Sequence, residues 1–69
     1  MNATEVHALV RSVIVHFGLP FAVLSVAASP VGWNIQVRAR TGGLVRFAVF
    51  GSRPVAMRIA IQERLEAEL

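Results

Sequence analysis

The sequence has no cysteine, no lysine and no aspartate, and its only acidic residues are four glutamates. Without cysteine, the chain cannot form a disulfide bond or a thiolate metal cluster. A nucleophilic triad needs a base that a carboxylate orients, and two histidines with four glutamates supply little material for one. We therefore expect that the protein is not an enzyme and that it holds no metal ion and no cofactor.

Charge is sparse as well, since 16% of the residues are charged whereas 55% are hydrophobic. Disordered chains have few apolar residues and a high charge, so this balance argues against disorder. A chain of 69 residues builds one hydrophobic core at most, so we expect a single domain over residues 1–69.

A long stretch without charge, from Ser12 to Val37, is the one feature that suggests a membrane segment. Gly18, Pro20 and Pro30 interrupt this stretch, and what lies between them is too short for a spanning helix. We therefore expect a cytoplasmic protein that does not contact a membrane.

An amphipathic helix is predicted over residues 4–17. Asn2 or Thr4 can cap it, and Asn2 and Glu5 have the spacing of a capping box. Gly18 is suited to the left-handed position that ends a helix. The predicted apolar stripe consists of Val6, Leu9, Val10, Val13, Ile14 and Phe17.

Three strands are predicted next, over Phe21–Ala28, Trp33–Arg40 and Leu44–Phe50. In the second and third strands, every other residue is apolar and is predicted to face the core. The residues between them face solvent, and they include Arg38, Arg40 and Arg46. Turn residues separate the strands, first Ser29-Pro30-Val31-Gly32 and then Thr41-Gly42-Gly43. Short connections of this kind predict a three-stranded antiparallel meander.

A second helix is predicted over residues 53–68, with Ser52 as its N-cap and Pro54 in its first turn. Its first half is apolar nearly all round. A helix that lies on one sheet buries one apolar stripe, so Val55 and Ile59 are surplus apolar residues that the sheet does not cover. The predicted fold is therefore α+β, in the order α-β-β-β-α, with both helices packed on one face of the meander.

This order and length resemble the double-stranded RNA-binding domain, a family that grips the phosphates of a duplex at the start of its second helix. Gly51-Ser52 matches the family's entry into that helix, Arg53 stands at the first lysine of its signature, and Ala56 and Ala60 stand at its alanines. Pro54 and Met57 stand where the other two lysines belong. The resemblance implies this fold and binding of RNA.

All seven basic residues are arginine, for which two interpretations stay open. One is a phosphate-binding role, since arginine is suited to bidentate contact with phosphate. The other is that a genome rich in G and C encodes arginine in place of lysine, and the composition alone favours this second interpretation. Two interpretations also stay open for the arginines of the sheet. They could bind a phosphate ligand, or they could form a solvated face whose charges discourage aggregation.

Two functional hypotheses follow. The first is a small basic module that binds the phosphate backbone of RNA or DNA. Its candidate residues are Arg11, Arg38, Arg40, Arg46 and Arg53. The second is a homo-oligomer, as a dimer, that associates through surplus apolar surface and binds no nucleic acid. Its candidate residues are Leu44, Phe50, Val55 and Ile59.

Overall fold

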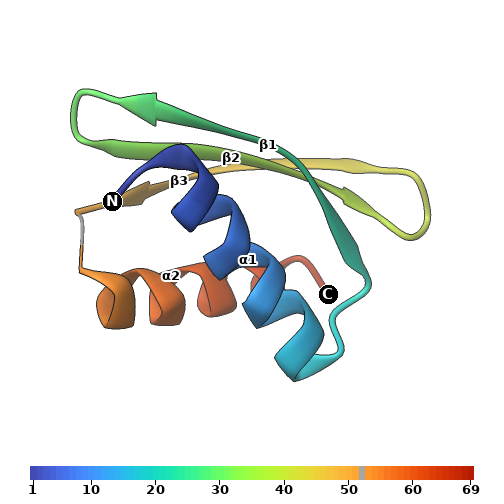
Figure 1. The fold of residues 1–69 in the computed structure, drawn as a ribbon. Helices are drawn as coiled ribbons and strands as arrows, with labels where there is room; N and C mark the ends of the chain where they lie inside the picture. The colour runs from blue at the N-terminus through green and yellow to red at the C-terminus, as the bar shows by residue number, and fades with distance from the viewer. Residues whose placement is uncertain (52) are drawn as a thin grey trace.

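Two helices lie on one side of an antiparallel sheet in a computed structural model, which describes residues 1–51 and 53–69 (Figure 1). The elements in chain order are α1 (Ala3–Phe17), β1 (Phe21–Ser29), β2 (Gly32–Ala39), β3 (Leu44–Phe50) and α2 (Pro54–Ala67). The three strands form one sheet in the order β1-β2-β3. The predicted α+β class and the α-β-β-β-α meander are therefore confirmed.

Local sequence signals explain where α1 begins and ends. The Asn2 side chain accepts a hydrogen bond from the Glu5 backbone N–H at 2.9 Å, and the Glu5 carboxylate accepts one from the Asn2 backbone N–H at 3.2 Å. Asn2, and not Thr4, is thus the cap, and the capping box is complete. The helix ends at Gly18, whose φ of 62° is in the left-handed region that glycine tolerates.

The helix α2 begins at Pro54, with Arg53 at its N-cap position and no capping hydrogen bond from the Arg53 side chain. Ser52, which was predicted as the cap, lies outside the described residues. The α2 residues Met57, Ile61 and Leu65 are buried, as their spacing predicts.

A β-bulge in β1 changes which side chains face solvent. Val23 pairs with Val37 and Ser25 pairs with Gln36, so Leu24 is an additional residue with no partner on β2. Because side chains alternate along a strand, the additional residue moves Ser25 to the solvent side of the sheet and Val26 to the helix side. Apolar composition alone did not predict this bulge.

The core lies between the helices and the inner face of the sheet, and its buried residues are all hydrophobic. Every element except β1 contributes a side chain with no more than 2% of its surface exposed. These residues are Val6, Val10, Val13, Ile35, Val37, Val49, Met57, Ile61 and Leu65. Within the described ranges, neither helix has the length and apolar character that crossing a membrane requires.

Two arginines of α2 connect this helix to other elements. Arg58 of α2 donates a hydrogen bond from Nη1 to Ser12 Oγ of α1 at 2.9 Å. The guanidinium carbon of Arg64 lies 5.8 Å from the centre of the Phe47 ring, which is within the range of a cation–π contact. These contacts give Arg58 and Arg64 structural roles within the fold.

Candidate functional site

The side of the sheet that faces away from the helices, here called the outer face, carries Arg38 and Arg46 together with other polar side chains. Alternation along the strands and the bulge at Leu24 together determine its members. They are Ala22, Ser25, Ala27, Asn34, Gln36, Arg38, Leu44, Arg46, Ala48 and Phe50. All of them are exposed except Gln36, which is half-buried.

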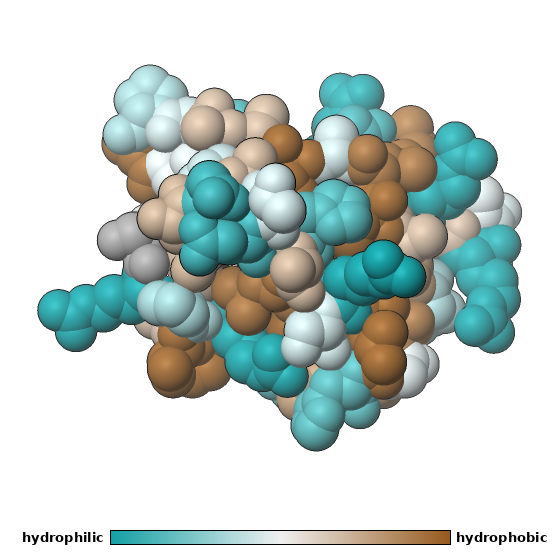
Figure 2. Space-filling view, viewed as in Figure 1, coloured by the Kyte–Doolittle hydropathy of each residue, from teal (hydrophilic) through white to brown (hydrophobic). Residues whose placement is uncertain are grey.

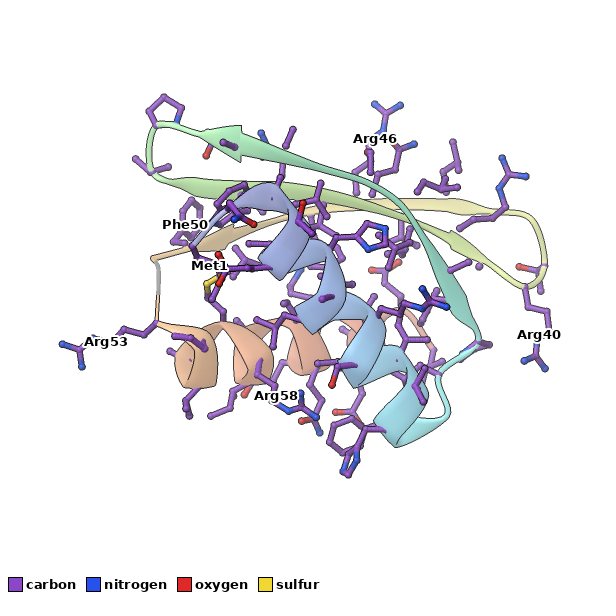
Figure 3. All side chains as sticks on the ribbon, in the orientation of Figure 1. Met1, Arg40, Arg46, Phe50, Arg53 and Arg58 are labelled. Atoms are coloured by element: carbon purple, nitrogen blue, oxygen red, sulfur yellow. The ribbon has the colours of Figure 1, made fainter. Side chains whose placement is uncertain are left out.

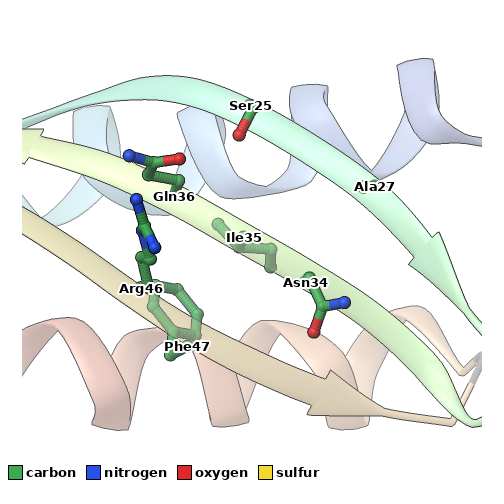
Figure 4. A pocket seen from close by; sticks show the side chains of 7 residues that line it. All are labelled: Ser25, Ala27, Asn34, Ile35, Gln36, Arg46 and Phe47. Atoms are coloured by element: carbon green, nitrogen blue, oxygen red, sulfur yellow. The ribbon is translucent and has the colours of Figure 1, made fainter.

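A shallow depression of about 330 Å³ lies at the centre of the outer face (Figure 4). Gln36 forms its middle, since Gln36 pairs with Ser25 of β1 on one side and with Arg46 of β3 on the other. Asn34 takes the next position along β2, between Ala27 and Ala48. The depression therefore combines a guanidinium, two side-chain amides and a hydroxyl with the small Ala27 and with parts of Ile35 and Phe47.

The register of β2 and β3 does not place Arg46 opposite Arg38 or Arg40. Arg46 pairs with Gln36, and Arg38 pairs with Leu44. The connection between Arg38 and Leu44 sets this register, because the backbone N–H of Ala39 donates to the Gly43 carbonyl. Arg38 and Arg46 thus occupy neighbouring diagonal positions, about 7–8 Å apart, which weakens their mutual repulsion.

The five predicted nucleic-acid-binding arginines do not form one surface. Arg38 and Arg46 share the outer face, and Figure 3 shows Arg46 pointing away from the helices. Arg40 follows β2 in a turn, where its backbone N–H donates to the Pro20 carbonyl, and its side chain points away from Arg46 (Figure 3). Arg53 lies at the start of α2 and Arg11 on the exposed side of α1.

The charges of the molecule are segregated. From residue 6 to residue 62 the sequence contains no acidic residue. The glutamates are confined to the start of α1 and to the end of α2 and the residue after it. No carboxylate on the outer face therefore competes with an anion for Arg38 and Arg46. This interval without acids was readable in the sequence, and the sequence-based reasoning missed it.

Two positions of the double-stranded RNA-binding signature, Ala56 and Met57, do not form a phosphate-binding surface at the start of α2. Met57, at the position of the third lysine, is 1% exposed and belongs to the core, whereas Ala56 is exposed. The connection between β1 and β2 consists of Pro30 and Val31 alone. Neither position offers a side chain that could donate to a phosphate.

The four predicted oligomer residues divide between two surfaces. Leu44 and Phe50 lie at opposite ends of β3 on the outer face, with exposed fractions of 52% and 69%. Val55 and Ile59 lie one turn apart on α2, with exposed fractions of 74% and 52%. Figure 2 shows apolar surface over the first turns of α2. One contact with a second copy could not cover both surfaces.

The described residues bring together no group of three or more side chains suited to hold a metal ion. Ser12 accepts its hydrogen bond from Arg58, while the ring of His16 packs edge-on against Phe17 with 4.7 Å between the ring centres.

A scan against protein-family models, a search of curated proteins and a search of solved structures found no match to this chain. Its function has to be inferred from its own residues.

Proposed function

We propose that this chain is a small nucleic-acid-binding module that holds phosphate groups on the outer face of its sheet. The observation that carries this proposal is the exposure of Arg38 and Arg46 side by side on a face that has no carboxylate. Guanidinium groups bind phosphate oxygens in a planar, bidentate geometry. The charge-free small residues around them, Ala22 and Ala48, leave room for a backbone to approach.

The neighbouring polar side chains extend what the arginines can do. Asn34, Gln36 and Ser25 each carry groups that can donate and accept hydrogen bonds. In nucleic-acid complexes, contacts to phosphate position the ligand and contacts to base edges discriminate between sequences. The arginines would supply the first kind of contact and the amides of Asn34 and Gln36 the second.

The resemblance to the double-stranded RNA-binding domain supports this function only through the order of the elements. Its phosphate-binding lysines are replaced here by Pro54 and by the buried Met57. We therefore assign ligand binding to the sheet and not to the start of α2.

The test is a fluorescence-anisotropy titration of labelled RNA and DNA at several salt concentrations. The double variant Arg38→Gln, Arg46→Gln removes two phosphate contacts, so the slope of log affinity against log salt should fall by about 1.4–1.8. The control Arg11→Gln, Arg53→Gln changes net charge equally but leaves the outer face intact, and should change the slope little. Equal losses in both variants, or no salt-sensitive binding by the unchanged protein, would contradict the proposal.

A second candidate function, self-association, is favoured by the charge distribution along α2. Arg53 lies at its start, whereas three glutamates outnumber Arg64 at its end, which are Glu63, Glu66 and Glu68. This arrangement opposes the helix dipole, which favours acids at the start and bases at the end. Two copies of α2 packed antiparallel would set the basic start of each helix against the acidic end of the other and cover Val55 and Ile59.

Self-association predicts a melting temperature that rises with protein concentration, because a partner subunit stabilises the folded state by mass action. The variant Val55→Ser, Ile59→Ser should remove this dependence and sediment as a monomer. Val15→Ser is the matched control, since Val15 is 73% exposed but lies on α1. A monomeric unchanged protein, or a dimer that survives the double variant, would exclude this contact.

A further inference from the structure

Phe50 is the only aromatic side chain among the members of the outer face, and 69% of its surface is exposed. Phe50 does not belong to the hydrophobic core, which at this end of β3 contains the buried Val49 instead. The exposed ring lies on the same face as Arg46, since residues 46, 48 and 50 alternate with the buried Phe47 and Val49. An exposed aromatic ring on a cationic sheet face is suited to stack against a nucleobase.

The neighbours of Phe50 leave its ring accessible. Its cross-strand partner on β2 is Gly32, which has no side chain. Ala48 precedes it on the same face of β3. A planar base therefore meets no bulky side chain at these two positions beside the ring.

We propose that the ligand of the outer face is a single-stranded nucleic acid, with one base stacked on Phe50 and phosphates farther along the strand held by Arg46 and Arg38. This inference rests on the proposed function and specifies its ligand. The strand follows β3, along which Arg46 precedes Phe50 by four residues, or about 13 Å. The amides of Asn34 and Gln36 lie on the neighbouring strand, beside the path between the ring and the guanidinium groups.

The same geometry disfavours a duplex. The bases of a duplex are stacked on one another, so none is free to lie on Phe50 unless the helix is opened. The double-stranded RNA-binding domain, which has the same element order, contacts its duplex through the first helix, the β1–β2 loop and the start of the second helix. Here that loop is Pro30 and Val31, and Met57 is buried.

The experiment compares three labelled probes in the same anisotropy assay: a single strand, the same strand without its bases, and the corresponding duplex. The unchanged protein should bind the base-containing single strand most tightly. Phe50→Leu keeps an apolar side chain but removes the aromatic face, and should weaken binding of that strand by about 5- to 30-fold. It should leave the affinity for the strand without bases unchanged.

Two further variants separate stacking from other causes. Phe50→Trp restores an aromatic face and should retain or strengthen binding. Val15→Ala removes an exposed apolar side chain from α1, away from the outer face, and should leave binding unchanged. Circular dichroism melting verifies that each variant is folded.

Failure of this inference is distinguishable from failure of the proposed function. Equal affinity for the strands with and without bases, or tighter binding of the duplex, would overturn the stacking role of Phe50. The proposed function would still stand in that case if Arg38→Gln, Arg46→Gln reduced the salt slope. If that double variant bound as tightly as the unchanged protein, both the stacking role of Phe50 and the proposed function would be overturned.

Discussion

Met57→Lys is expected to abolish most of the folded state. Met57 is 1% exposed and packs between α2 and the sheet, where no carboxylate is available to pair with an ammonium group. An unpaired buried charge costs about 3–5 kcal/mol, and a 69-residue domain has only about 3–10 kcal/mol of stability to lose. Urea unfolding followed by circular dichroism measures the effect.

The matched control is Ala56→Lys, one residue earlier on α2. Ala56 is exposed, so a lysine side chain at this position stays in water. It should change the free energy of unfolding by less than about 0.5 kcal/mol. The pair also tests how α2 is rotated. In a helix oriented as the double-stranded RNA-binding signature requires, residue 57 would face the ligand and tolerate lysine, and residue 56 would not. That opposite outcome would contradict the buried position of Met57.

Gly32→Ala is the second variant with a large expected effect. A Cβ atom at Gly32 would collide with the carbonyl oxygen of Val49 and lie 2.8 Å from the Cα atom of Phe50. Both atoms belong to the backbone of β3, so relief requires the two strands to move apart. Overpacking of this kind costs about 1–3 kcal/mol, and we expect the upper end of that range because no flexible side chain can yield.

Gly43→Ala is the control for the variant at Gly32. A Cβ atom at Gly43 meets no atom within 4 Å, and Gly43 is not among the glycines with positive φ. Its replacement should be neutral or slightly stabilising, because alanine reduces the conformational freedom of the unfolded chain. Thermal melts of the two variants measure the difference. Equal melting temperatures would show that β2 does not approach β3 as closely at Gly32 as described.

Local signals were sufficient where the relevant partners are close in sequence. The capping box of Asn2 and Glu5 and the stop at Gly18 were predicted, because each depends on residues within one turn. The bounds of β3 were predicted to the residue, since alternation and the turn before it are both local. The bounds of α1 and β1 differ from the prediction by one residue at one end, and those of β2 and α2 by one residue at each end.

The candidate site was predicted in part. Arg38 and Arg46 were predicted on one solvent-facing surface, as the structure places them. Arg40 was expected on the same surface, but β2 ends at Ala39, so Arg40 belongs to the turn that follows. Ser25 was not predicted at all, because its orientation depends on the bulge at Leu24.

The sequence by itself determined the order of the elements, the caps of α1, the alternation of β2 and β3, and the segregation of the glutamates from the sheet. Only the tertiary structure decided the bulge in β1, the register that pairs Arg46 with Gln36, and the rotation of α2 that buries Met57. The physical reason is that caps and alternation depend on neighbours along the chain. Register and rotation depend on which faces bury the most apolar surface against other elements.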